Sequence, residues 1–256
     1  MMTEPLYRGI VTAFKGVFRG LGMRIDVVGE ENIPLDGGAI LAINHTSYLD
    51  FALGGVPADL RGRRLVRFMA KDSIFRHRVA GPLMRGMKHI PVDRDAGSAA
   101  FRDAVDAAKA GELIGVFPEA TMSESLEIKE LKNGAVRMAR TAKVPLIPMI
   151  IFGGHRILGY ETRDFTRGRS ICMTVGPPLD IPRGSDPDAL TEQLRTELTG
   201  LLDATIARYP DKPEGAPWIP RRHGGSAPTL DEAATREMER RERRRAQREA
   251  KDRQSG

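Results

Sequence analysis

Short runs of wholly apolar residues are the feature that most restricts the fold of this chain. Ala39–Ile43 and Leu113–Val116 carry no polar side chain, and Val144–Gly154 is a longer run of the same kind. Runs of about four to eight such residues are typical of strands buried on both faces, as in parallel sheets covered by helices. The longest run is about half the length of a membrane-spanning helix and is interrupted by prolines, so no transmembrane segment is predicted.

Helical patterns separate these runs. Ser98–Ala110 reads as a helix ended by Gly111, Lys132–Lys143 as a second, and Pro187–Tyr209 as a last helix that closes the domain. Ser170–Val175 reads as a further strand. The alternation predicts an α/β fold, with a mostly parallel central sheet flanked by helices and its chemistry at the carboxyl edge of the strands.

A histidine and an aspartate follow the first apolar run, in the segment Asn44–Asp50. On one continuous helix, residues five apart point about 140° away from each other, so His45 and Asp50 meet only if His45 precedes a helix and Asp50 lies in its first turns. A carboxylate that holds one imidazole N–H stabilises the imidazolium, which makes His45 a candidate general base. The alternative is a loop histidine, with an aspartate that favours the positive end of a helix.

A glutamate follows the second apolar run in the same way. Pro118 cannot donate to a β-ladder, so the strand is expected to stop there and to leave Glu119 at its carboxyl edge. Thr121 and Glu124 have the spacing of a capping box. The alternative for Glu119 is therefore a solvated carboxylate just before a helix.

These segments together resemble the glycerolipid acyltransferases, the family that includes lysophosphatidic acid acyltransferases. Its first block is a histidine and an aspartate separated by four residues, as in His45 and Asp50, and its third is Phe-Pro-Glu-Gly-Thr-Arg, to which residues 117–122 are similar. His89–Arg94 resembles the second block, which ends in an arginine, and Val144–Pro148 resembles the fourth, a proline-bracketed strand. The resemblance spans residues 27 to 210, with the blocks in the family's order.

The resemblance implies that a fatty acyl group passes from acyl-CoA or acyl carrier protein to the free hydroxyl of 1-acyl-glycerol 3-phosphate, giving phosphatidic acid. His45 would take the hydroxyl proton, Asp50 would orient His45, and backbone N–H groups near the helix start would stabilise the oxyanion. No cofactor is implied beyond the acyl donor. The alternatives are an acyltransferase for glycerol 3-phosphate or a glycolipid hydroxyl, and a catalytically silent lipid-binding protein of the same fold.

The resemblance also implies a set of substrate-binding residues, namely Lys71, Arg94, Glu119, Thr121 and Lys132. Arg94 is expected to make a charge-assisted contact with the acceptor phosphate. Its alternative is a surface arginine paired with Asp93 or Asp95. Glu119 is expected to position the acceptor or to orient a basic residue.

The chain departs from the third block at Ala120 and Met122, where the family has glycine and arginine. The missing guanidinium changes part of the expected phosphate site. Lys129 and Lys132 follow closely and offer a replacement charge, although an ammonium group lacks the bidentate fork of arginine.

Composition excludes several other functions. The single cysteine, Cys172, cannot form an internal disulfide and is expected to pack as a small hydrophobic residue. No Cys/His or carboxylate cluster has metal-ligand spacing, so no metal site is predicted. The net charge is +6, but the arginines near the carboxyl terminus alternate with acids at helical spacing. That pattern favours a solvated helix over a nucleic-acid-binding arm.

The first residues predict an amphipathic helix over 5–23. Its apolar positions are Leu6, Ile10, Phe14, Val17 and Leu21, widened by Val11 and Phe18, and its cations are Arg8, Lys15 and Arg19. Such a helix either lies on an anionic bilayer or packs on the domain, and the acyl substrate favours the bilayer. With no recognisable signal peptide, the expectation is a cytoplasmic protein, peripheral on the inner face of the membrane.

The chain is therefore divided into a membrane-associating helix at 1–26, an acyltransferase domain at 27–210, and a tail at 211–256. In the tail, an extended segment is expected to use Trp218 as an anchor on the domain surface. Thr229 and Glu232 then have the spacing of a capping box ahead of a charged helix at Leu230–Arg253. The expected partners are the acyl thioester, the lysophospholipid and an anionic membrane surface, and not nucleic acid.

Overall fold

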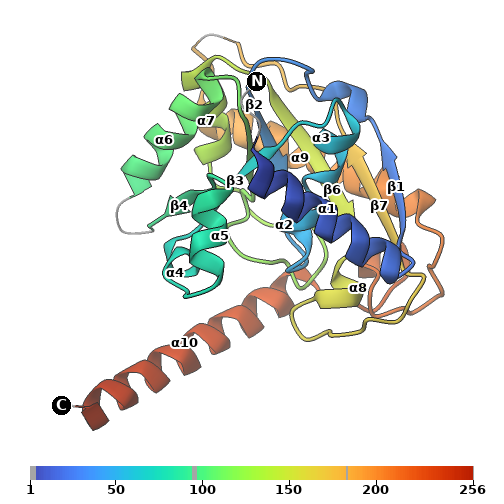
Figure 1. Ribbon diagram of the computed structural model, residues 1–256. Coiled ribbons are helices and arrows are strands. Elements are labelled where there is room, and N and C mark those ends of the chain that lie inside the picture. Colours follow the sequence, from blue (N-terminus) through green and yellow to red (C-terminus); the bar gives the residue numbers. More distant parts are fainter. Residues whose placement is uncertain (1–3, 94–96, 183, 256) are drawn as a thin grey trace.

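The computed structural model describes residues 4–93, 97–182 and 184–255. Within them, seven strands form one sheet in the order β1-β7-β6-β2-β5-β3-β4 (Figure 1). The strands are β1 Arg24–Val28, β2 Ala39–Ile43, β3 Val66–Lys71, β4 Ile90–Val92, β5 Leu113–Val116, β6 Leu146–Phe152 and β7 Ser170–Val175. Only the β6–β7 pair is antiparallel among the paired strands of this described region. The predicted α/β fold with a mostly parallel sheet is confirmed.

Helices cover both faces of the sheet, and one helix, α10 Leu230–Ser255, extends away from it (Figure 1). The other helices are α1 Pro5–Gly20, α2 Asp50–Leu53, α3 Val56–Leu60, α4 Asp72–Phe75, α5 Ala80–Gly86, α6 Gly97–Lys109, α7 Gly134–Ala142, α8 His155–Leu158 and α9 Pro187–Arg208. The predicted helices at 98–110, 132–143 and 187–209 correspond to α6, α7 and α9, and their ends differ by two residues or fewer. The short helices between α1 and α6 were not predicted, since they have too few turns to show a period.

Two hydrophobic cores lie on opposite faces of the sheet. On one face, α6, α7 and α9 bury side chains such as Val105, Val136 and Leu198. On the other face, α1, α2, α3 and α8 cover the sheet with side chains such as Phe18 and Leu53. Because both faces are covered, β2, β5 and β6 are buried along their whole length. This is why their sequences are continuous apolar runs rather than alternating ones.

The helix α1 packs on the domain along one side. Phe18 is 6% exposed and belongs to the core, and the Tyr7 hydroxyl donates to the Val66 carbonyl oxygen at 2.6 Å. Lys15 forms an ion pair with Asp59. The expectation that Phe18 widens a membrane-facing side is wrong, because that ring fills a gap under the helix.

An outer apolar side of α1 remains in solvent, formed by Leu6 and Val17. The interpretation that α1 packs on the domain holds for its inner side, and contact of its outer side with a bilayer stays a prediction. The boundary drawn at residue 26 falls inside β1, which pairs with β7 in parallel. Within the described residues, no helix combines the length and the apolar character needed to cross a membrane.

The carboxyl-terminal segment returns to the domain before α10 begins. The Trp218 indole N–H donates to the Asp211 carbonyl oxygen, and its ring lies under the guanidinium of Arg156, 4.0 Å from the ring centroid. The predicted capping box is present: Thr229 N–H donates to the Glu232 carboxylate, and Glu232 N–H donates to the Thr229 hydroxyl. The helix α10 then extends away from the body of the molecule (Figure 1).

Asn44 fixes the carboxyl end of β2. Its side-chain amide donates to the Ile151 carbonyl oxygen at 3.1 Å, and its side-chain oxygen accepts the Ile151 N–H at 2.7 Å. This pair of bonds continues the β2–β6 ladder beyond Met149, where backbone pairing between the two strands ends. The residue before His45 is thereby held to a central strand.

We predict that Asn44→Ala lowers the free energy of unfolding, because it leaves the buried N–H and C=O of Ile151 without partners. Each unpaired group is expected to cost about 1–3 kcal/mol. Chemical denaturation measures the loss. Asn133→Ala removes an exposed side-chain bond to Asp188 and serves as the control, with an expected change within about 0.5 kcal/mol. An equal, small effect of both variants would show that the Asn44 bonds do not hold the strand end.

Candidate active site

The segment between β2 and α2 brings a histidine and an aspartate together. His45 Nδ1 lies 2.9 Å from Asp50 Oδ2, and Asp50 is the first residue of α2. The same carboxylate oxygen accepts the backbone N–H groups of Thr46 and Ser47, each at 2.8 Å. Asp50 is fully buried, and these donors satisfy Oδ2, whereas Oδ1 has no hydrogen-bond partner among the described residues. The contact forms in the way that the five-residue spacing requires, with His45 before the helix and Asp50 at its start.

Aromatic rings fix the plane of the His45 side chain. The imidazole stacks on Phe117 with the ring centroids 4.4 Å apart, and Phe51 meets it edge-on at 6.5 Å. Because Nδ1 faces Asp50, Nε2 is the ring nitrogen that remains to exchange a proton with a bound molecule. The roles of Phe51 and Phe117 were not recognised from the sequence, where both read as ordinary apolar residues.

The backbone of this segment has no N–H group left for an oxyanion. His45 N–H donates to Glu119, Tyr48 N–H to the Leu158 carbonyl oxygen, and Leu49 N–H to the Ser47 hydroxyl. Thr46 and Ser47 donate to Asp50, and Asp50 N–H donates back to the Ser47 carbonyl oxygen. Residues 45–50 therefore offer no free backbone donor, and the oxyanion contact expected from N–H groups near the helix start stays a prediction.

Glu119 joins the two loops at the carboxyl edge. Its two carboxylate oxygens accept the backbone N–H groups of His45, at 2.9 Å, and Lys129, at 3.2 Å. Burial raises the pKa of Glu119 to about 7, and the two N–H bonds act in the opposite direction. No helix begins between Thr121 and Asn133, so the alternative of a solvated glutamate before a capped helix is wrong.

Ala120 keeps the backbone form of the glycine that it replaces. Its φ is 60°, in the left-handed region where a side chain is disfavoured and glycine is not. The backbone after Glu119 thus adopts a conformation that glycine takes more easily than alanine.

A cavity of about 380 Å³ opens beside His45. Lys71, at the end of β3, and Lys132, just before α7, line it together with the imidazole. The rest of the wall is largely apolar and includes Met69, Val92, Phe117 and Met138. The structure therefore brings together four of the predicted site residues: His45, its partner Asp50, Lys71 and Lys132.

Thr121 and Lys129 lie elsewhere and are absent from the cavity wall. Lys129 Nζ donates to the Thr121 hydroxyl at 2.6 Å and pairs with Glu237 of α10 at 3.5 Å. Lys129 is thus engaged by the carboxyl-terminal helix. Arg94 lies outside the described residues.

A second, strongly apolar cavity of about 260 Å³ adjoins the first. It lies between α1 and the segments around α2, α3 and α5, and it shares Phe51 and Ile74 with the His45 cavity. Ile10 and Phe14 of α1 and Met84 of α5 contribute to its wall. Its lining comes from four separate segments, so the sequence alone does not reveal it.

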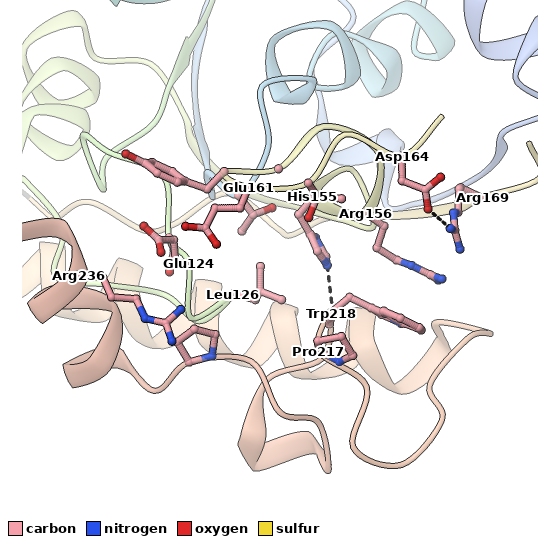
Figure 2. Close-up of a pocket in the computed structure, with 16 residues that line it drawn as sticks. Glu124, Leu126, His155, Arg156, Glu161, Asp164, Arg169, Pro217, Trp218 and Arg236 are labelled. Carbon is pink, nitrogen blue, oxygen red and sulfur yellow. Dashed lines mark hydrogen bonds and ion pairs between the residues drawn. The ribbon is translucent and has the colours of Figure 1, made fainter. Parts of the chain in front are cut away.

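Figure 2 shows a third cavity, of about 370 Å³, which lies beyond Thr46 and toward the carboxyl-terminal segment. Several of its charged side chains pair with one another or with the carboxyl-terminal segment. Arg169 pairs with Asp164, Arg156 pairs with Asp211, and His155 Nε2 lies 3.0 Å from the Trp218 carbonyl oxygen. Burial lowers the pKa of His155 to about 4, so this imidazole is neutral and donates to Trp218.

Cys172 is buried in β7, and burial raises the pKa of its thiol. The expectation that it packs as a small hydrophobic residue is confirmed. Across the residues that the structure describes, no group of three or more His, Cys, Asp or Glu side chains is placed to hold a metal ion.

The sequence model of the protein family described as Acyltransferase matches residues 24–152, and the chain belongs to this family. It is an acyltransferase related to the lysophosphatidic acid acyltransferases.

Two curated relatives carry the name 1-acyl-sn-glycerol-3-phosphate acyltransferase. The one from Bacillus subtilis is 28% identical over 206 residues, which cover 77% of this chain and 96% of the relative. The one from Borreliella burgdorferi is 25% identical over 194 residues, which cover 71% and 73%. The crystal structure of the 1-acyl-sn-glycerophosphate acyltransferase PlsC from Thermotoga maritima has the same fold, with a TM-score of 0.63 at 22% identity over 78% of this chain and 80% of that one.

The raised pKa of Glu119 predicts a pH-dependent stability. The carboxyl has a pKa near 4.5 in the unfolded chain and about 7 in the folded one. Between these values the folded protein keeps a proton that the unfolded chain releases, so this group lowers stability as the pH rises from 4.5 to 7. Below 4.5 the group is protonated in both states and contributes no such slope.

Glu119→Gln removes this titration. We expect the free energy of unfolding of the variant, relative to wild type, to increase from pH 5 to pH 8. Urea denaturation at four pH values measures the difference, and Glu130→Gln, which neutralises an exposed glutamate, is the charge-matched control. A difference that stays constant over this range would contradict the assignment of a raised pKa to Glu119.

Proposed function

We propose that this protein transfers a fatty acyl group from acyl-CoA or acyl carrier protein to the free hydroxyl of 1-acyl-glycerol 3-phosphate, giving phosphatidic acid for phospholipid synthesis. The observation that carries the proposal is the 2.9 Å contact between His45 Nδ1 and Asp50 Oδ2 beside a cavity lined by lysines and apolar side chains. The names of the two curated relatives support this choice of acceptor.

In the proposed reaction His45 acts as the general base. Asp50 accepts a hydrogen bond from Nδ1–H and stays ionised, which leaves Nε2 to take the proton of the acceptor hydroxyl. The acceptor oxygen attacks the thioester carbonyl, a C–O bond forms, and the C–S bond breaks. The imidazolium returns its proton to the leaving thiolate, so the products are an ester and a free thiol.

Lys71 and Lys132 are proposed to bind the acceptor phosphate. Both are exposed at the rim of the His45 cavity, where an ammonium group can reach a phosphate without being desolvated. Arg94 follows Val92, a residue of the cavity wall, by two positions and is proposed as a third cation. Glu119 is proposed to position His45 by accepting a hydrogen bond from its backbone N–H.

The acyl chains are proposed to lie in the two apolar cavities that meet at Phe51 and Ile74. A chain in the second cavity would pass along the inner side of α1, against Ile10 and Phe14. The exposed outer side of α1, with Leu6 and Val17, is proposed to rest on an anionic membrane surface from which such lipids come.

We predict that His45→Ala lowers turnover by about 100- to 10,000-fold, the range for removing a general base. Asp50→Asn is also expected to impair turnover, because it removes the charge that stabilises the imidazolium. The measurement is the release of free thiol from acyl-CoA in the presence of lysophosphatidic acid. His223→Ala, on the carboxyl-terminal segment, is the control histidine. Wild-type turnover in a folded His45→Ala protein would falsify the proposed mechanism.

A second prediction separates acceptor binding from chemistry. Lys132→Ala and Arg94→Ala are each expected to weaken use of the acceptor by about 1.5–3 kcal/mol, the range for a lost hydrogen bond to a charged group. Kinetics with varied lysophosphatidic acid measure this effect, and use of the thioester should change far less. Lys129→Ala is the matched control, since its ammonium pairs with Glu237 outside the cavity. An acceptor KM that changes for Lys129→Ala and not for Lys132→Ala would show that Lys129, rather than Lys132, binds the phosphate.

A further inference from the structure

The segment from Asp72 to Gly86, here called the α4–α5 hairpin, presents apolar side chains to solvent. Val79 at its turn is 68% exposed, Leu83 is 40% exposed and Ile74 is 37% exposed. Single exposed apolar residues are common on protein surfaces, but these three project from one short segment. The α4–α5 hairpin therefore forms an apolar surface patch.

The α4–α5 hairpin is held rigidly in this position. Phe75 is buried, and its carbonyl oxygen accepts a hydrogen bond from the Arg85 guanidinium at 2.7 Å. Gly81 N–H donates to the His77 carbonyl oxygen at 2.9 Å, and a Cβ at Gly81 would collide with the Phe75 carbonyl. The α4 and α5 parts of the hairpin thus pack closely against each other. The turn between them, with Val79, lies outside the domain core.

Cations accompany these apolar side chains. Arg76, Arg78 and Arg85 lie within the α4–α5 hairpin, and Asp72 is its one carboxylate. Asp72 pairs with Arg76 at 2.8 Å. The excess positive charge around exposed apolar side chains is complementary to a bilayer with anionic headgroups above an apolar interior.

The α4–α5 hairpin adjoins the exposed side of α1. Leu6 of α1 occupies the space that a Cβ at Gly86 would need, so the two segments are in contact. Ile74 and Met84 line the apolar cavity from the hairpin side, and Phe14 lines it from the α1 side. The two exposed apolar surfaces therefore flank the same cavity, which leads to His45 through Phe51 and Ile74.

We propose that the α4–α5 hairpin is a membrane-binding surface in its own right, in which Val79, Leu83 and Ile74 insert into an anionic bilayer while Arg76 and Arg78 contact lipid phosphates. Together with α1, it would hold the mouth of the apolar cavity against the lipid from which the acceptor comes. The assignment of that acceptor rests on the proposed function, but binding of the hairpin to lipid does not.

The experiment is sedimentation of the full-length protein with vesicles of phosphatidylglycerol and phosphatidylcholine, compared with vesicles of phosphatidylcholine alone. Val79→Ser combined with Leu83→Ser is expected to weaken binding to both kinds of vesicle by about tenfold or more, because apolar burial is lost. Arg76→Gln and Arg78→Gln are each expected to weaken binding to the anionic vesicles by about fivefold and to leave binding to the neutral ones unchanged.

Leu35→Ser is the matched control. Leu35 is 52% exposed and precedes the amino end of the central strand β2, whereas the α4–α5 hairpin follows the carboxyl end of β3. Val79→Ser alone, at the most exposed position, covers the case in which the double variant does not fold. Wild-type binding by the folded Val79 and Leu83 variants would overturn the proposal. Unchanged vesicle binding with loss of transfer from acyl carrier protein would overturn it as well, because the surface would then be a protein contact.

The vesicle assay needs no substrate, so its result is independent of the proposed reaction. A protein that loses vesicle binding through Val79 and Leu83 but transfers no acyl group to any lysophospholipid would support the membrane surface and refute the proposed function. A protein that transfers acyl groups to lysophosphatidic acid in detergent, and binds vesicles equally with and without the hairpin changes, would support the proposed function and refute the membrane surface.

Discussion

The parallel pairing of β2 with β5 is the constraint on which the site depends. Ala42 lies opposite Val116, so both strands end at the same level and their following loops run side by side. Glu119 then joins the loops by accepting the N–H of His45, and Asn44 fixes the preceding residue to β6. A buried carboxylate between two backbone donors is costly to disturb, since each lost bond leaves an unpaired group. The position of the His45 imidazole is therefore set by the strands of the sheet.

The two buried carboxylates of the site, Asp50 and Glu119, have different hydrogen-bond partners. Asp50 and Glu119 are both buried, but Asp50 accepts bonds from the imidazole and two backbone N–H groups, whereas Glu119 accepts two backbone N–H groups. Asp50 thus contacts the group proposed to move a proton, and Glu119 contacts only the framework. Lys71 and Lys132, by contrast, stay in solvent at the cavity rim, which suits groups that exchange water for a phosphate.

The two termini contribute in different ways. The helix α1 buries Phe18 and Tyr7 against the domain and closes one side of an apolar cavity, while its outer side remains apolar and exposed. The carboxyl-terminal segment is anchored by Trp218, and α10 engages the loop after β5 through the pair of Glu237 with Lys129. The helix α1 and the first half of α10 thus both contact the domain, while the rest of α10 extends away from it (Figure 1).

The sequence by itself determined the strands β2 and β5 and the helices α6, α7 and α9, because continuous apolar runs mark buried strands and a period of 3.6 residues marks long helices. It also indicated the pairing of His45 with Asp50, because their spacing limits how the two side chains can meet. Only the tertiary structure decided that Phe18 belongs to the core, that Lys129 turns toward α10, and that the backbone N–H groups of residues 45–50 are all engaged. These outcomes depend on which segments, distant along the chain, come to lie against a given side chain. Burial and hydrogen-bond partners are properties of that contact, and a local pattern does not contain them.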